Sequence, residues 1–199
     1  MIEALFTIAF TTLVLLGSPG PAPLALAATG AAQGFKRGLP FLCGILAGLL
    51  VAVILVASGM ATLLVEQPQI SGGLKWAAAA YLLYVAYKIA CNKSALDSKE
   101  QSLPRFYDGV LLNLLNPKAY AACIAIFAST SVPVESTLVA TVLSAGVCYS
   151  VAILVDIVWL ALGGIIAKKI THAGALRIIR LAFAMSLVLL ALLVVIRKH

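Results

Sequence analysis

Two ionisable residues stand inside apolar segments of this chain. Lys118 follows a proline in "NLLNPKAY", and Asp156 lies in "VAILVDIVWLAL". A charged side chain is costly in hydrocarbon, so each of these residues needs a polar partner or a watery cavity. One interpretation is structural: the two form an ion pair, or Lys118 extends toward the membrane surface. The alternative is functional: Asp156 binds a proton or an ammonium group, while Lys118 or freed N–H groups bind a carboxylate.

Tyr149 precedes Asp156 by two helical turns within the same apolar segment. Residues at this spacing share one face of a helix. We therefore expect this face to carry Tyr149 toward the same cavity as Asp156.

The stretch "GSPGPAP" interrupts the first apolar run with Pro19, Gly20 and Pro21. A signal peptide is disfavoured because "MIEA" carries no basic residue, and a helix ending at Gly17 is too short to cross a bilayer. We therefore expect one crossing made of two half-helices, with an unwound centre. Such a centre must face protein or a watery cavity, although a simple proline kink for packing is the alternative.

The segment "NLLNPKAY" supplies a counterpart in the second half of the chain, again near the middle of an apolar run. Matched interruptions in two halves are the best sequence pointer to a transporter binding site. The sequence thus predicts that substrate is bound or gated by Pro19, Gly20, Pro21, Asn116, Pro117, Lys118 and Tyr149, and that Asp156 binds a proton or an ammonium group.

The composition places these residues in a membrane protein. Of 199 residues, 63% are hydrophobic and 11% are charged, and a soluble domain would carry about a quarter charged residues. Apolar runs of membrane-crossing length occupy roughly 2–33, 39–65, 72–90, 107–131, 136–163 and 175–196. We expect an all-α integral membrane protein with six transmembrane helices, the first and fourth broken at the proline motifs.

The basic residues alternate between the gaps that separate these runs. The first, third and fifth gaps are rich in Lys and Arg, whereas the second and fourth contain Glu66 and Glu135. The positive-inside rule then places both termini on the outer side of the membrane. Residues 2–90 and 107–197 form two blocks of opposite topology, joined by a cytoplasmic loop at about 91–106. We expect a single transmembrane domain, 1–199, built from two inverted three-helix repeats.

The same distribution argues against other classes of protein. The net charge of +7 lies in short gaps, as a topology signal does, and does not predict nucleic-acid binding. No nucleophile–base pair or nucleotide-binding glycine loop is present, so we expect neither an enzyme nor a cofactor. Export of a metal or other inorganic ion would need His, Cys and carboxylate ligands at the midplane. A thiol or electron carrier would need paired cysteines, and only Cys43 and Cys123 occupy corresponding positions; we expect the cysteines to be small buried residues.

The motifs together resemble the lysine exporter (LysE/RhtB) family of small bacterial amino-acid exporters. The resemblance covers nearly the whole chain and rests on "SPGP" at Ser18–Pro21, "GFKRG" at Gly34–Gly38, the paired Gly44 and Gly48, the third run "LKWAAAAYLLYVAYKI", "NLLNPKA" at Asn113–Ala119, and Asp156 with Trp159. It implies secondary active export of amino acids or related metabolites across the bacterial inner membrane, by proton antiport and as a homodimer.

Departures from the family pattern concern the substrate. The family often has asparagine where this chain has Ala22, and a polar residue where it has Leu49. The third run has Ala78 and Ala86 where glycines are common. These replacements favour a less polar pocket and hence a small neutral or apolar substrate over lysine or arginine.

Overall fold

The computed structural model describes residues 1–59, 76, 79–84, 86–87, 104–130 and 132–169, together with 178, 181–182, 184–185, 188–189 and 191–192. The continuous helices within these ranges are α1 (Ile2–Gly17), α2 (Pro21–Gln33), α3 (Phe35–Ala57), α6 (Phe106–Leu114), α7 (Pro117–Ser129) and α8 (Thr137–Lys169). The described residues contain no strand. An all-helical protein with membrane-compatible helices is thus confirmed.

Both predicted helix breaks are present. Helices α1 and α2 meet at 64° across the first proline motif, and α6 and α7 meet at 60° across the second. Pro21 and Pro117 each occupy a first helical turn, where proline's fixed φ is favourable and its missing N–H costs nothing. The two motifs therefore bend the chain by nearly equal angles.

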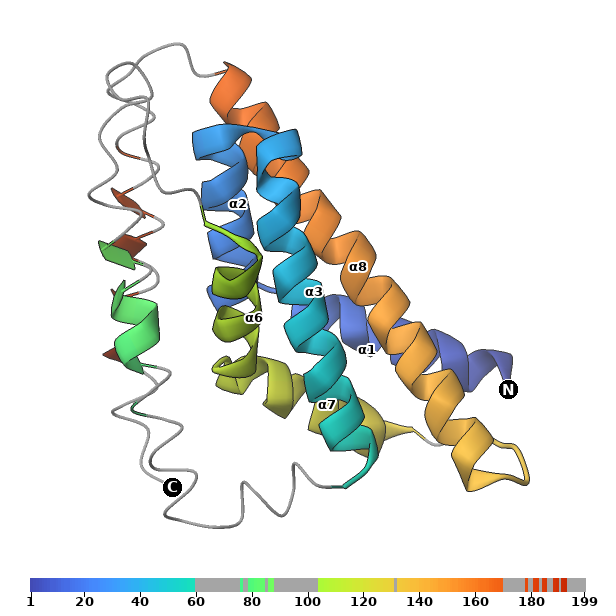
Figure 1. Cartoon of the computed structure of the whole chain (residues 1–199). Helices are drawn as coiled ribbons and strands as arrows, with labels where there is room; N and C mark the ends of the chain where they lie inside the picture. Colours follow the sequence, from blue (N-terminus) through green and yellow to red (C-terminus); the bar gives the residue numbers. More distant parts are fainter. Residues whose placement is uncertain are drawn as a thin grey trace.

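Helices α3 and α8 are the long straight members of the bundle (Figure 1). Both are long and apolar enough to cross a membrane, and the described part of the chain contains up to four spans if each bent pair counts as one. The predicted third and sixth spans and the loop at about 91–106 fall largely outside the described residues.

Helix α2 is the innermost helix of the bundle. Its residues Pro21–Gly30 are all buried, and it packs against both α3 and α8 (Figure 1). Gly34 links α2 to α3 with φ of 78°, a left-handed conformation that glycine adopts without steric cost. The chain can therefore reverse direction within one residue and lay α3 back along α2.

Glycines let the helices approach closely at this end of the bundle. A Cβ on Gly163 of α8 would collide with the Ala27 carbonyl of α2, and a Cβ on Gly44 of α3 would collide with the Phe106 carbonyl of α6. Inside a membrane the hydrophobic effect does not drive helices together. Close van der Waals packing between backbones therefore contributes to their association. Gly44, one of the paired glycines noted in the sequence, thus lies where α3 meets α6.

The core has two parts. The basic-end core, named for its position near Lys36 and Arg37, includes Leu26, Phe41, Ile45, Leu112 and Leu160. The opposite core includes Ile8, Val53, Cys123, Ile126 and Val132. The two helix breaks, one between α1 and α2 and the other between α6 and α7, lie between these cores.

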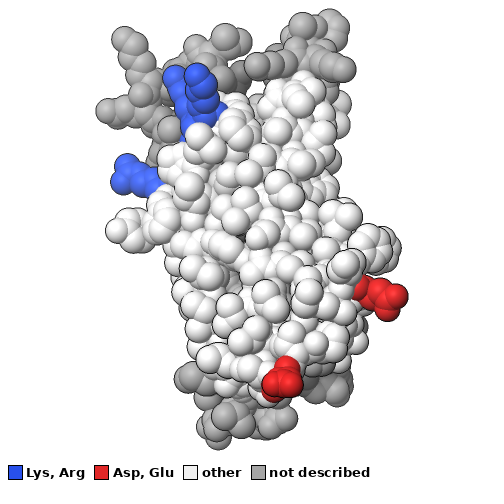
Figure 2. Space-filling model, turned by 90° about the vertical axis from the view of Figure 1, so that its right-hand side faces the viewer, with Lys and Arg blue, Asp and Glu red and all other residues white. Residues whose placement is uncertain are grey.

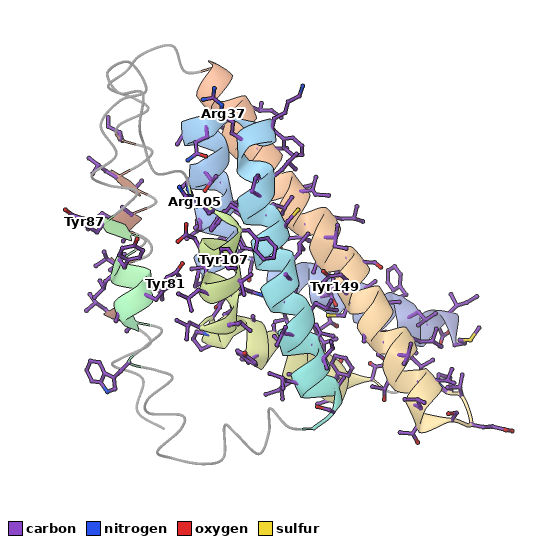
Figure 3. The ribbon with its side chains drawn as sticks, viewed as in Figure 1. Arg37, Tyr81, Tyr87, Arg105, Tyr107 and Tyr149 are labelled. Atoms are coloured by element: carbon purple, nitrogen blue, oxygen red, sulfur yellow. The ribbon has the colours of Figure 1, made fainter. Side chains whose placement is uncertain are left out.

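Charges on the visible surface separate toward the two ends of the molecule. Figure 2 shows basic groups toward one end, acidic groups toward the other, and an uncharged surface between them. Arg37 and Arg105, from the first and third gaps, both lie in the upper part of Figure 3. One described basic residue from each of these two gaps therefore lies toward the same end of the bundle.

Candidate functional site

Carbonyl groups exposed by the first break are bound by side chains from other helices. Trp159 of α8 donates its Nε1–H to the Gly17 carbonyl at 3.1 Å. The Lys118 ammonium of α7 donates to the Ser18 carbonyl and, at 3.2 Å, to the Pro19 carbonyl. Unpaired backbone groups are costly inside a membrane, so these contacts stabilise the unwound segment.

Gly20 makes room for the Lys118 side chain. A Cβ at this position would stand 2.7 Å from Lys118 Cδ and 2.8 Å from its Nζ. The Gly20 backbone is extended, with φ of −172°, so the need for glycine here comes from space and not from backbone conformation. The first proline motif thus leaves a space at Gly20, called the lysine socket below, which is occupied by the side chain of Lys118 from almost a hundred residues further along the sequence.

The second break is capped by its own residues. Asn116 Oδ1 accepts the Lys118 N–H at 3.1 Å, and the Asn116 carbonyl accepts the Ala119 N–H at 3.0 Å. This is the usual N-cap arrangement, in which a side-chain oxygen satisfies a donor of the first helical turn. In this conformation Asn116 therefore accepts hydrogen bonds from the first N–H groups of α7, which the sequence suggested as donors to a substrate carboxylate.

A pocket lies between the two breaks. All of the helices α1, α2, α3, α6, α7 and α8 contribute to it, and its unfilled space, including the open mouth, is about 330 Å³. Its polar lining comprises Asn113, Asn116, Lys118 and Asp156, and its apolar lining comprises Leu16, Ala22, Pro23, Leu49, Ala119 and Ala152.

Asp156 is 6% exposed and has neither an ion-pair nor a hydrogen-bond partner in the part of the chain that the structure describes. Lys118 lines the same pocket but binds the carbonyls of the first break instead. The structural interpretation of a Lys118–Asp156 ion pair therefore does not apply to this conformation. A buried carboxyl group therefore faces the pocket with no hydrogen bond or ion pair from the described residues.

Asn113 is a polar residue of the pocket that the sequence reasoning missed. It is 2% exposed, and its Nδ2 has no hydrogen-bond partner. The available signal was the repeated asparagine of "NLLN", because residues three apart share a helix face. Asn113 and Asn116 indeed line the same pocket.

Most of the other predicted residues lie beside this pocket and do not line it. Pro19, Gly20 and Pro21 form the break beside it, whereas the lining itself comes from Ala22 and Pro23. Pro117 begins α7 next to two lining residues. Ala22 and Leu49, which the sequence marked as departures toward lower polarity, both face the pocket.

Tyr149 is not part of the described pocket lining. Its hydroxyl donates to the Leu46 carbonyl of α3 at 3.1 Å (Figure 3). Two helical turns separate residues 149 and 156 by about 10 Å along the axis, so a shared face does not ensure a shared cavity.

The cysteines are arranged differently from the prediction. Cys123 and Cys148 are buried, but Cys43 is exposed, so the expectation of a buried residue was wrong for Cys43. Cys91 lies outside the described residues. Among the residues that the structure describes, no three His, Cys, Asp or Glu side chains are grouped as ligands of a metal ion.

The chemistry of the pocket is that of reversible binding. A carboxyl group can bind an ammonium group or a proton, and a carboxamide N–H can bind an oxygen acceptor. The aliphatic walls supply contacts for a small uncharged side chain. These properties suit a small molecule that carries both an ammonium group and an acceptor.

Comparisons with known proteins agree with a transport role. The family model described as LysE type translocator matches residues 13–198. A cysteine/O-acetylserine efflux protein of Salmonella choleraesuis is 32% identical over 107 residues, which are 54% of this chain and 55% of that protein. The protein of the same name from Salmonella paratyphi A is 36% identical over 93 residues, 47% of each chain.

An uncharacterized membrane protein of Pseudomonas aeruginosa is 34% identical over 119 residues, which are 55% of each chain. The matched part therefore spans about half the length of these relatives. No solved structure is significantly similar to the chain. Because the family model covers nearly the whole sequence, the chain belongs to the LysE type translocator family, whose members are transporters and not enzymes.

Proposed function

We propose that this protein is a secondary active exporter of small neutral amino acids or closely related metabolites. The observation that carries the proposal is the pocket between the two helix breaks. It is lined from every continuous helix of the described structure and holds a buried carboxyl group without a partner. Broken helices around a central polar site are the arrangement by which many secondary transporters bind substrate.

The proposed substrate class follows from the groups that line the pocket. Asp156 is suited to the ammonium group of an amino acid, and Ala22 and Leu49 present apolar surface to its side chain. Among the described residues that line the pocket, none besides Asp156 supplies a carboxylate to bind a cationic side chain such as that of lysine. Cysteine and O-acetylserine, named for the relatives, are both small and neutral, and they are the first compounds to test.

Asp156 is also the proposed coupling group for protons. One carboxyl group cannot bind a proton and neutralise an ammonium group at the same time. Substrate release toward the outside would therefore allow Asp156 to accept a proton there, and proton release inside would restore the site for substrate. This exchange is proton antiport, and it requires no further ionisable group in the pocket.

The proposed architecture is six transmembrane helices in two inverted repeats, in the bacterial inner membrane and with both termini outside. The two bent helix pairs, at 64° and 60°, support the repeat, and the shared position of Arg37 and Arg105 supports a common cytoplasmic end. A homodimer, suggested by the family resemblance, belongs to the same proposal.

The test is efflux of labelled amino acids from proteoliposomes, with and without a pH gradient. We expect saturable efflux of a small neutral amino acid that an imposed gradient accelerates, and much weaker efflux of lysine. The panel should include cysteine, O-acetylserine, alanine, serine and lysine. Absence of flux for every small neutral amino acid would overturn the proposal, and efflux restricted to lysine would overturn the substrate class.

A further inference from the structure

Two buried side-chain atoms of the described helices, Gln33 Oε1 and Asn113 Nδ2, lack a hydrogen-bond partner, and of these two residues Asn113 is the one that lines the pocket. Thr12 and Ser144 donate to carbonyls of their own helices, at 2.7 Å and 2.8 Å. Asn116 caps α7. Asn113, 2% exposed, leaves its Nδ2 without an acceptor among the residues that the structure describes. A buried donor without a partner destabilises the fold, so its retention calls for an acceptor that arrives from outside the chain.

The position of Asn113 is fixed by its neighbours. It stands in the last turn of α6, and its carbonyl accepts the Asn116 N–H at 3.0 Å. Gly48 of α3 lies directly behind it, since a Cβ on Gly48 would come within 3.0 Å of Asn113 Cβ. The carboxamide is thus held at the wall of the pocket by the second break on one side and by α3 on the other.

The missing acceptor can be identified from the rest of the pocket. Among the described residues that line the pocket, Asp156 is the one carboxyl group, and it suits an ammonium group. A ligand that brings an ammonium group to Asp156 and an oxygen acceptor to Asn113 carries the two charges of an α-amino acid. Hydrogen bonds from neutral donors to a carboxylate are stronger than those to neutral acceptors.

We propose that Asn113 binds the carboxylate of the substrate and so restricts the exporter to zwitterionic amino acids. This inference rests on the proposed function, and it names the side chain that selects among the small metabolites proposed there as substrates. An amine without a carboxylate would leave Asn113 unpaired and should be exported poorly. Asn113 is then a specificity-determining residue, and Gly48 is the residue that makes space for it.

The test compares amino acids with their decarboxylated counterparts in proteoliposomes that contain the full chain. The probe pairs are L-cysteine with cysteamine and L-alanine with ethylamine. In Asn113→Leu, which has a similar volume but no donor, we expect KM for the amino acids to rise about 10- to 100-fold, the range for a hydrogen bond to a charged group. KM for the amines should stay unchanged, so the preference for the carboxylate disappears.

Two controls separate binding from folding. Leu111→Ala changes the same helix at a side chain that is 45% exposed and does not line the pocket, and it should leave KM for both probes unchanged. Thermal unfolding without substrate should occur at the same or a higher temperature in Asn113→Leu than in the natural protein, because the unpaired amide is gone. A structural asparagine would give the opposite shift.

The outcomes distinguish the inference from the function on which it rests. If the natural protein exports the amino acids and Asn113→Leu keeps the same preference over amines, the inference is overturned and the proposed function stands. If Asn113→Leu is equally impaired with amines, or unfolds at a lower temperature, Asn113 is structural and the inference also fails. If the natural protein exports none of the amino acids, both fail.

Discussion

The two helix breaks bend the chain by similar angles but satisfy their backbone groups in opposite ways. The first break is held from a distance: Lys118 of α7 and Trp159 of α8 donate to three of its carbonyls. The second break is capped locally by Asn116. A change in the conformation of the first break therefore requires α7 or α8 to move with it, whereas the second break is stabilised by a residue of its own segment.

This difference suggests how movement would pass through the protein. A hydrogen-bonded link between helices transmits displacement, while a local cap allows a helix to turn about its own end. Lys118 belongs to both breaks, since its N–H is capped by Asn116 and its ammonium binds Ser18 and Pro19. We infer that Lys118 couples the two half-helix junctions on either side of the pocket.

The largest expected effect comes from Lys118→Met, which keeps the chain length but removes all three donors. The Ser18 and Pro19 carbonyls would lose charge-assisted hydrogen bonds inside the membrane. Two such bonds correspond to about 3 kcal/mol. We expect a clearly lower unfolding temperature in detergent and at least a tenfold loss of efflux. Unchanged unfolding and efflux would show that Lys118 does not support the first break.

Gly20→Ala should have a smaller effect through the same contact. The extended backbone tolerates alanine, but the new methyl group would displace the Lys118 side chain. We expect destabilisation of about 1–2 kcal/mol, within the range for overpacking. The double variant Gly20→Ala/Lys118→Met should unfold like Lys118→Met alone, because the methyl group then meets a flexible thioether. Additive losses would contradict the socket interpretation.

Asn116→Ala tests the local cap and should be the mildest of these changes to stability. Loss of an N-cap costs about 1 kcal/mol, and Asn116→Ser should recover most of it. Unfolding temperatures measured without substrate would report this difference. If Asn116→Ala destabilised the protein as much as Lys118→Met, the two breaks would not differ in the way described above.

The breaks could be predicted from sequence because proline and glycine act on the backbone where they stand. "SPGP" and "NPK" mark the ends of α1 and α6 and the starts of α2 and α7 within a few residues. The short-range effect of these residues does not depend on the rest of the fold. The positions of the two breaks therefore followed from local chemistry.

The partners within the site could not be predicted in the same way. Whether Lys118 meets Asp156 or the Ser18 carbonyl depends on how α7 packs against α1 and α8, which local sequence does not determine. Tyr149 shares a face with Asp156, yet its hydroxyl lies beside Leu46 of α3. Asn113 was missed because an unpaired amide is recognised only when every neighbour is in place.

The most direct test of the central claim measures proton and substrate movement together. Proteoliposomes with a pH-sensitive dye inside and labelled L-cysteine as substrate would be compared for the natural protein and Asp156→Asn, which has nearly the same shape but cannot exchange a proton. The account predicts that cysteine efflux is accompanied by proton entry in the natural protein and that this coupled flux is lost in Asp156→Asn. Coupled flux that persists in Asp156→Asn would contradict it.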